Sequence, residues 1–170
     1  LSLQIHGESG ESPLYHSIDG KVRFFKGDVR NEKDWLKALD GQDCVIHLAA
    51  ETGTGQSMYE IKKYTDVNTG GTALLLDILA NKSHTVKKIM VASSRAIYGE
   101  GKYSCPVHGI VYPGHRTEKD MASGDFRIKC PVCSENAELL STDEESLAHP
   151  ASIYGITKLT QEQREVPYGQ

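Results

Sequence analysis

A tyrosine and a lysine four residues apart could perform proton transfer in this chain. Tyr154 and Lys158 fall in a segment with helical character, where positions four apart lie on one face and direct their side chains into the same space. A neighbouring ammonium group stabilises the phenolate form, which lets a tyrosine act as a general base. The pair alone is weak evidence, because solvated helix faces often carry the same two residue types.

Ser94 could supply a hydroxyl group to the same reaction. It follows an apolar segment that reads as a parallel strand, and open α/β sheets bind their ligands beyond the carboxyl ends of such strands. The hydroxyl of Ser94 and the phenol of Tyr154 must therefore converge at one edge of the sheet if they act together.

Three cysteines and one histidine form two short pairs that are typical of metal ligands. Residues 105–108 (Cys-Pro-Val-His) and 130–133 (Cys-Pro-Val-Cys) each place two residues between potential ligands. The thiolates of Cys105, Cys130 and Cys133 with the imidazole of His108 suit tetrahedral Zn(II), and a set with no open position indicates a structural ion. His115 could replace one of these ligands, but it lacks the two-residue spacing of the knuckles. Reduced, unligated cysteines and a redox Cys-x-x-Cys pair are the alternatives.

Strands and helices alternate around these residues. The sequence predicts strands at residues 22–26, 43–50 and 86–93. It predicts helices at residues 32–39, 59–80 and 152–164. Asn31 caps the first helix, and the second strand reads as an apolar run covered on both faces of the sheet. This order is typical of a doubly wound parallel α/β sheet.

Residues 101–146 interrupt the alternation. The segment is polar, rich in turn-forming residues and poor in apolar periodicity. We therefore expect an insertion that carries the metal site and separates the Ser94 strand from the Tyr154 helix.

Composition and charge favour a protein that acts on a small molecule. The 170 residues are 38% hydrophobic and carry a formal net charge of -4, with no long run of one sign. This gives no electrostatic reason to expect a nucleic-acid or anionic membrane partner. No apolar stretch approaches the roughly 18 to 20 residues that span a bilayer, and no signal-peptide pattern is visible, so we expect a cytoplasmic protein.

Residues 93–99 (Ser-Ser-Arg-Ala-Ile-Tyr-Gly) resemble the catalytic serine segment of extended short-chain dehydrogenases/reductases, the NAD-dependent epimerase/dehydratase family. Further segments match the family in the same order: residues 27–30 (Gly-Asp-Val-Arg), residues 47–50 (His-Leu-Ala-Ala), Asn68 with Gly71 and Thr72, and Tyr154 to Lys158 with Pro150 four residues before the tyrosine. The resemblance implies a Rossmann-like fold with Ser94, Tyr154 and Lys158 as catalytic residues.

The resemblance also implies NAD as the cofactor and assigns residues to it. Asp28 and Val29 would hold the adenine. The strand end at Leu48, Ala49 and Ala50 would pass beside the cofactor. The remaining assigned residues are Asn68, Tyr154 and Lys158, of which Lys158 would hold the nicotinamide ribose.

Within the family, the insertion and the segments at 56–60, 99–103 and 142–144 most resemble dTDP-L-rhamnose 4-epimerase-like members. This resemblance implies a nucleotide-sugar substrate, with dTDP as the nucleotide. A 4-keto sugar would form by oxidation and be reduced again on its other face, and the family commonly forms homodimers. A 4,6-dehydratase is the nearest alternative. Such enzymes carry Asp-Glu after the catalytic Thr for water elimination, and the presence of Arg95 and Ala96 at these positions argues against that reaction. A reductase, or a non-catalytic zinc-binding module on a degraded Rossmann scaffold, is a further alternative.

The family's Gly-x-x-Gly-x-x-Gly loop and the acidic end of its second strand are not found in these residues. Leu1 to Gly7 resembles the segment after that second strand, and the chain starts without Met. We therefore expect a truncated enzyme whose partial sheet lacks the first βαβ unit, without a C-terminal substrate domain, that binds NAD poorly and is inert alone. The expected organisation is a partial NAD-binding domain at 1–100, a zinc-ribbon-like insertion at 101–146 and a return to the Rossmann domain at 147–170.

Overall fold

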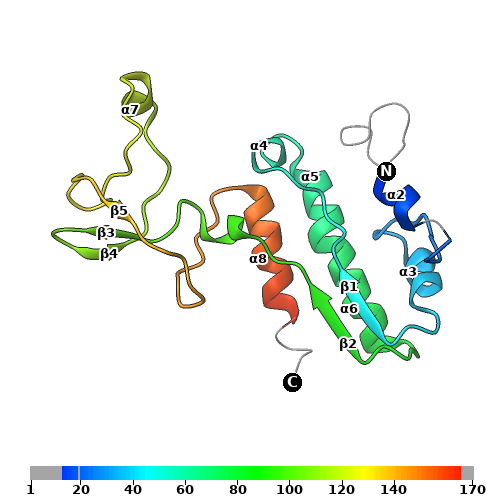
Figure 1. Cartoon of the computed structure of the whole chain (residues 1–170). Helices are drawn as coiled ribbons and strands as arrows, with labels where there is room; N and C mark the ends of the chain where they lie inside the picture. Colours follow the sequence, from blue (N-terminus) through cyan, green and yellow to red (C-terminus); the bar gives the residue numbers. More distant parts are fainter. Residues whose placement is uncertain (1–12, 19, 166–170) are drawn as a thin grey trace.

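The computed structural model describes residues 13–18 and 20–165, which form an α/β body and a protruding insertion lobe, residues 101–146 (Figure 1). The body contains, in chain order, α2 (Pro13–Ile18), α3 (Glu32–Leu39), β1 (Cys44–His47), α4 (Thr54–Ser57), α5 (Ile61–Tyr64), the π-helical η1 (Thr65–Gly70), α6 (Gly71–Asn81), β2 (Lys88–Val91), the 3-10 helix η2 (Arg95–Tyr98) and α8 (Ile153–Glu165). The segment at Leu1 to Gly7 lies outside the described residues.

The centre of the body is a parallel pair of strands, as predicted. β1 and β2 pair in register from Cys44 opposite Lys88 to His47 opposite Val91, and both are shorter than the sequence suggested. Their inward side chains pack on helices α3 and α6 in one core cluster, formed by Leu39, Leu75 and Ile78 with Trp35, Val45, Leu74, Leu79, Val86 and Ile89. Burial of this apolar surface is what fixes the helices on the sheet.

The prediction that β1 is covered on both faces is wrong for the described residues. Ile46 is 62% exposed and its partner across the sheet, Met90, is 40% exposed, whereas Val45 and Ile89 face the helices. Right-handed crossovers that progress in one direction across a sheet place their helices on one face. The described residues contain no crossover in the opposite direction, so the second layer of a doubly wound sheet is not seen among them.

The predicted strand at residues 22–26 is also wrong. Residues 23–28 have no regular secondary structure, and Val22 and Phe24 are 54% and 55% exposed. A strand needs a neighbour to satisfy its backbone groups, and no described segment pairs with this one. The helix that follows matches its prediction, because α3 spans residues 32–39 and the Asn31 side chain accepts from the Lys33 amide at 2.9 Å.

The predicted helix at 59–80 is a composite of α5, η1 and α6. The π-helical turn η1 was not foreseen from the sequence. Such turns insert a residue into an α-helix and often lie at functional sites. Here the turn contains Asn68, which is fully buried and contacts both the segment after β1 and helix α8.

The insertion lobe is a small sheet with one short helix. It contains β3 (Tyr103–Cys105), β4 (Gly109–Val111), α7 (Glu118–Ala122) and β5 (Glu138–Leu139), and the antiparallel strand order is β4-β3-β5. Its core comprises Tyr103, Cys105, Val111, Ile128 and Cys130. Two of these five residues are metal-ligand candidates, so the apolar core of the lobe is small.

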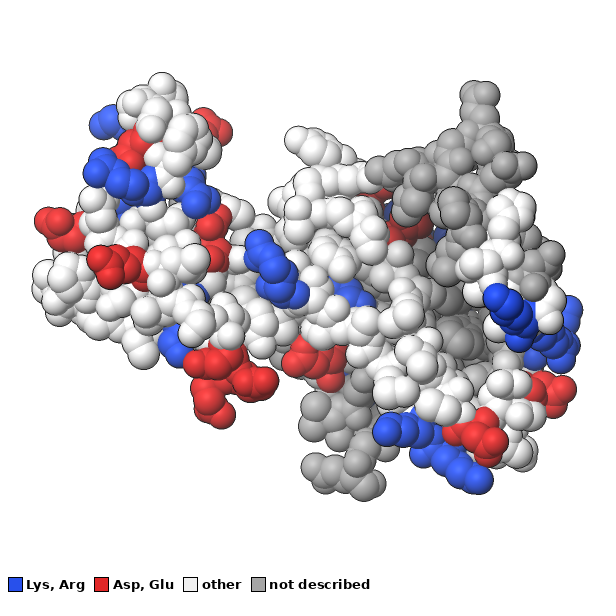
Figure 2. All heavy atoms as spheres, in the orientation of Figure 1, with Lys and Arg blue, Asp and Glu red and all other residues white. Residues whose placement is uncertain are grey.

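Charges of both signs are interspersed over the body and the insertion lobe on the face drawn in Figure 2. Among the residues that the structure describes, no helix has the length and apolar character required to cross a membrane.

Helix α8 approaches η2 closely because residue 155 is glycine. A Cβ placed on Gly155 would lie 2.5 Å from the carbonyl oxygen of Ala96 and 3.1 Å from Cβ of Pro150. The backbone carbonyl cannot move without shifting η2. This contact brings the start of α8 beside the end of β2.

We expect Gly155→Ala to lower the free energy of unfolding by about 1 to 3 kcal/mol, measured by urea denaturation. In an open helix the same change would stabilise by about 1 kcal/mol, so the steric clash decides the sign. Gly70→Ala is the matched control. A Cβ placed on Gly70 would lie 3.6 Å from the Thr65 carbonyl oxygen, which is an ordinary contact distance. A Gly155→Ala variant as stable as Gly70→Ala contradicts the tight α8–η2 contact.

Candidate functional site

Ser94 and Tyr154 line the same cleft, of about 340 Å³. Its walls come from the segment after β2, the start of α8, the start of α4 and the insertion lobe. The lining residues are Thr54, Ser94, Arg95, Ala96, Gly99, Glu100, His115, Ala151, Ser152 and Tyr154. Ser94 and Tyr154 therefore lie at the same cleft, as expected from the sequence.

Contacts of Tyr154 itself and a cap on its helix fix its position. Its amide donates to the hydroxyl of Ser57 at 3.0 Å, and its ring lies edge-on to Tyr64 with the centroids 6.4 Å apart. Tyr64 is fully buried and donates its own phenol to the Thr52 carbonyl at 2.6 Å, so burial raises the pKa of Tyr64 and keeps it neutral. The Ser152 hydroxyl caps α8 by accepting from the Gly155 amide at 3.0 Å.

Ser94 ends the strand segment and begins η2. Its hydroxyl oxygen accepts from the Ala96 amide at 3.2 Å, as an N-cap does, and its O–H hydrogen can still be donated to a ligand. The neighbouring Ser93 instead donates to the carboxylate of Glu162 on α8, at 2.7 Å. The two adjacent serines therefore have different tasks, one facing the cleft and one tying β2 to α8.

Lys158 lies one helical turn after Tyr154 and is 3% exposed, and it is not one of the described residues lining the cleft. It sits near His47, which is buried beside it. The His47 Nε2 lies 3.1 Å from the Thr72 hydroxyl, which donates to the Asn68 carbonyl and accepts from Gln161. Because the Thr72 hydrogen is already used, the imidazole donates to Thr72 from Nε2.

We expect a pH dependence of stability from His47. Burial, with a smaller contribution from the Lys158 charge, lowers the pKa of His47 from 6.5 to about 4. Between these values the unfolded chain binds a proton that the folded protein excludes, so stability is lost as pH falls through this window, by up to about 3 kcal/mol. Denaturation curves from pH 7 to 4 should show this slope in wild type and not in His47→Gln. Equal slopes in the two proteins contradict it, and His84→Gln, at an exposed histidine, is the control.

Five of the eight residues expected to hold NAD lie at the carboxyl end of β1 (Leu48, Ala49, Ala50) and beside α3 (Asp28, Val29), and the other three lie in η1 and α8. Leu48 is 69% exposed and Ala49 is exposed, so this strand end offers an apolar edge. Asp28 and Val29 line a hollow of about 150 Å³. Hydrogen bonds and charge from Arg30 lower the pKa of Asp28 to about 2, which keeps the carboxylate ionised as an acceptor.

Asn68 faces the protein interior. Its Oδ1 accepts from the Glu51 amide at 2.8 Å, and its Nδ2 donates to the Glu51 carbonyl at 3.1 Å and to the Thr157 hydroxyl at 3.0 Å. These bonds hold the segment after β1 against α8. The Asn68 amide thus positions the strand end next to the cleft.

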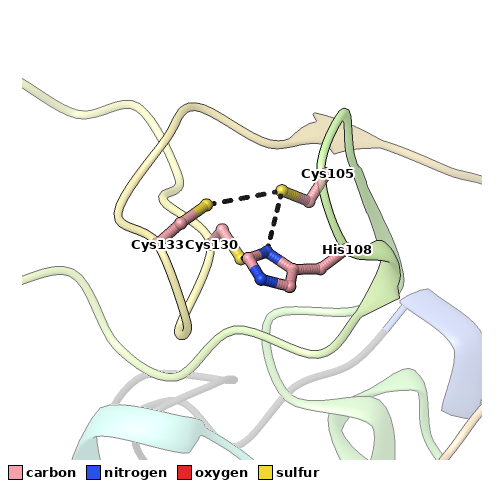
Figure 3. A group of neighbouring side chains, drawn as sticks. All are labelled: Cys105, His108, Cys130 and Cys133. Atoms are coloured by element: carbon pink, nitrogen blue, oxygen red, sulfur yellow. Dashed lines mark hydrogen bonds between the residues drawn. The ribbon is translucent and has the colours of Figure 1, made fainter.

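The four predicted metal ligands converge in the insertion lobe (Figure 3). One ligand atom from each of Cys105, His108, Cys130 and Cys133 lies within 4.8 Å of the others. Each knuckle also has the amide of its third residue donating to the first sulfur, Val107 to Cys105 and Val132 to Cys130, both at 3.4 Å. His115 is not part of this set.

Three of the distances between the candidate ligand atoms match those around a tetrahedral ion. A Zn(II) with Zn–S bonds of about 2.3 Å and a Zn–N bond of about 2.05 Å separates two sulfurs by about 3.8 Å and sulfur from nitrogen by about 3.6 Å. The Cys105–Cys133 sulfurs and the two sulfur contacts to His108 Nδ1 all measure 3.6 Å. Burial opposes ionisation of Cys105, but hydrogen bonds from Val107, His108 and Cys130 outweigh it and lower the pKa of the Cys105 thiol to about 6.

The sequence also matches a known family over most of its length. Residues 6–116 match the NAD dependent epimerase/dehydratase family. The chain belongs to this family.

One relative within the epimerase/dehydratase family aligns with almost all of the chain. A dTDP-L-rhamnose 4-epimerase from Burkholderia thailandensis is 36% identical over 164 residues, which cover 95% of this chain and 43% of the relative. A UDP-glucose 4-epimerase from Lacticaseibacillus casei is 37% identical over 89 residues, covering 51% of this chain and 26% of the relative. The chain thus spans less than half the length of either relative.

Solved structures of epimerase/dehydratase enzymes share the fold. A UDP-glucose 4-epimerase from Bifidobacterium longum, in complex with NAD+ and UDP, superposes with a TM-score of 0.60 at 25% identity, covering 94% of this chain and 39% of that one. A dTDP-glucose 4,6-dehydratase from Streptomyces venezuelae superposes with a TM-score of 0.62 at 21% identity, covering 90% and 36%. At 21% identity, the match to the dehydratase shows a shared fold and nothing further.

Sequence reasoning missed several residues of the cleft in this epimerase/dehydratase chain. Thr54 lies in α4, a helix too short to produce a periodic signal, and His115 lies in a segment without regular structure. Glu100 and the Arg116 that pairs with it are separated by 16 residues and carried no motif. Their proximity depends on how the insertion lobe folds back, which local pattern does not encode.

Proposed function

We propose that this chain forms part of an NAD-dependent nucleotide-sugar 4-epimerase, with Tyr154 as the proton acceptor and Ser94 as its partner. The observation that supports this most directly is the shared cleft: the serine at the end of the parallel strand and the tyrosine at the start of α8 line the same space. The family and the epimerase relatives point to the same chemistry.

In the proposed reaction, Tyr154 removes the proton from the sugar 4-hydroxyl while Ser94 donates a hydrogen bond to the same oxygen. NAD, when bound, supplies the hydride acceptor and donor. Lys158, one turn behind Tyr154, favours the phenolate electrostatically. A 4-keto sugar forms, and reduction on its opposite face inverts C4 while Tyr154 returns the proton.

The cofactor would be held at the carboxyl edge of the sheet. The exposed apolar strand end at Leu48 and Ala49 and the ionised Asp28 beside Val29 fit a dinucleotide that runs along this edge. Asn68 acts through the backbone of Glu51, which it holds in place.

Two features favour epimerisation over 4,6-dehydration. The positions after Ser94 are Arg95 and Ala96, which provide no carboxyl pair to remove a proton from C5 and protonate a leaving hydroxyl. In addition, the alignment with the dTDP-L-rhamnose 4-epimerase covers 95% of the chain. An alignment of this extent includes the insertion lobe. The UDP-glucose 4-epimerase alignment covers only 51% of the chain. A dTDP-linked sugar is therefore the proposed substrate class.

The insertion lobe is proposed to hold a structural zinc ion. Three thiols and one imidazole that converge within 4.8 Å leave no position open for a substrate, which suits a structural ion. The ion would supplement the small apolar core of this lobe.

The test is turnover by the full-length protein, expressed from the complete reading frame that contains these residues. It should be incubated with NAD and either dTDP-L-rhamnose or UDP-glucose, and the C4 configuration followed by NMR. We expect interconversion of C4 epimers with the dTDP sugar. Loss of the 6-hydroxyl as water from UDP-glucose, or no turnover of either nucleotide sugar, contradicts the proposal. The purified 170-residue chain alone is expected to be inert, because it contains no Gly-x-x-Gly-x-x-Gly loop for the pyrophosphate.

A further inference from the structure

His115 belongs to the insertion lobe but lines the cleft that contains Ser94 and Tyr154. It lies between β4 and α7 in a segment without regular structure, and its side chain is exposed. The metal-ligand set does not include it. An exposed imidazole in the wall of a ligand cleft is available to a ligand.

The residue after His115 anchors this segment to the body. Nη1 of Arg116 lies 3.2 Å from both carboxylate oxygens of Glu100, which also lines the cleft, and Nε donates to the Phe126 carbonyl at 2.8 Å. The Arg116 and Glu100 side chains are 33% and 22% exposed, so water screens the pair only in part. The backbone at His115 is thereby held at the cleft.

The metal centre restrains the other side of the same segment. Val111, four residues before His115, packs in one cluster with the ligands Cys105 and Cys130. His115 also borders a second hollow, of about 430 Å³, whose walls include Ile128 and Cys130. The path of the chain from β4 to the cleft is therefore bounded by the metal-held core and by the Arg116–Glu100 pair.

The chemistry of this part of the cleft suits a polyhydroxylated ligand. A neutral imidazole has one donor and one acceptor nitrogen, which match the two functions of a hydroxyl group. The neighbouring Glu100 carboxylate is engaged by Arg116, so it does not compete for the imidazole as an ion-pair partner.

We propose that His115 is a substrate-recognition residue, which the metal-bearing insertion lobe places in the cleft to hydrogen-bond the sugar of the nucleotide sugar. The proposal rests on the proposed function of the Ser94–Tyr154 cleft. Under this proposal, the insertion lobe contributes a residue that contacts the substrate directly.

The test compares binding of dTDP-L-rhamnose and of dTDP by calorimetry to the full-length protein and its variants. His115→Ala should weaken binding of the nucleotide sugar roughly 3- to 10-fold, the value of one hydrogen bond, and leave dTDP binding unchanged. His115→Gln, which keeps a donor and an acceptor, should recover part of the loss, whereas His115→Phe should not. His84→Ala, at an exposed histidine that lies outside the cleft, is the matched control.

The outcomes separate this inference from the function it rests on. Unchanged affinity for dTDP-L-rhamnose in His115→Ala overturns the role of His115, and equal losses for the sugar nucleotide and dTDP overturn contact with the sugar. A wild-type protein that binds neither compound overturns the proposed function as well.

A double variant tests whether the metal centre positions His115. Cys133→Ser should weaken sugar-nucleotide binding about as much as His115→Ala, and the two changes together should be no worse than Cys133→Ser alone. Losses that add instead overturn the dependence of His115 on the metal centre.

Discussion

Tyr154→Phe is expected to lower kcat of the full-length protein about 10²- to 10⁴-fold with little change in KM, because it removes the group proposed to take the proton from the sugar. The phenylalanine ring keeps the edge-on contact with Tyr64, and the backbone amide of residue 154 still donates to Ser57. Stability should therefore be unchanged, which separates lost chemistry from a lost fold. Steady-state kinetics by NMR and thermal unfolding measure both quantities.

The matched control for this substitution is Tyr59→Phe, because Tyr59 is 91% exposed and outside the described cleft. It should leave kcat and stability at wild-type values. A Tyr154→Phe protein with kcat within about threefold of wild type would remove Tyr154 from the proton-transfer step, since general acid-base catalysis contributes far more than that.

Local sequence signals predicted the elements whose stabilising contacts lie within a few residues. Asn31 and the amphipathic pattern after it gave α3 its bounds, because a cap and a helix face are both short-range features. The two knuckles likewise identified the four converging side chains that are proposed as metal ligands, since a two-residue spacing encodes the local turn. The pairing of Ser94 with Tyr154 came from the order of motifs along the chain.

Features that depend on distant neighbours were not predictable in this way. Residues 22–26 have strand-forming composition but no partner among the described residues, and pairing decides whether such a segment becomes a strand. Ile46 belongs to an apolar run that suggested full burial, yet only one face of β1 is covered. The π-helical turn around Asn68 reflects a tertiary requirement, because the amide must reach Glu51 and Thr157 at once.

The cleft combines both kinds of information. Gly155 is ordinary in the sequence of a helix, but its missing side chain lets α8 reach the Ala96 carbonyl and so brings Tyr154 to the edge that Ser94 occupies. Sequence reasoning identified Ser94 and Tyr154 as the proposed reacting groups, whereas the contact that brings them together became visible only in three dimensions.

Cys130→Ser is expected to abolish stoichiometric zinc binding and to unfold the insertion lobe. The lobe core contains five buried residues, of which Cys105 and Cys130 are proposed ligands, so three apolar side chains remain without the ion. Structural zinc contributes about 10 to 16 kcal/mol in small metal-binding modules, comparable to the whole stability of an ordinary domain. Three apolar side chains cannot replace such a contribution.

The measurement is hydrogen exchange across β3, β4 and β5, with zinc content determined by atomic emission. Wild type should bind one zinc per chain and protect these amides, and both features should disappear in Cys130→Ser or after chelation. The α/β core around Leu75 and Ile78 contains no metal ligand and should keep its protection.

Cys44→Ser is the matched control, because Cys44 is exposed on β1 and lies outside the ligand cluster. It should retain both zinc and protection, which excludes a general effect of removing a thiol. A wild-type protein without bound metal, whose thiols react fully with Ellman's reagent under native conditions, would rule out the zinc centre. In that case the insertion lobe would need another source of stability, since the burial of Tyr103, Val111 and Ile128 is too small a core to order it.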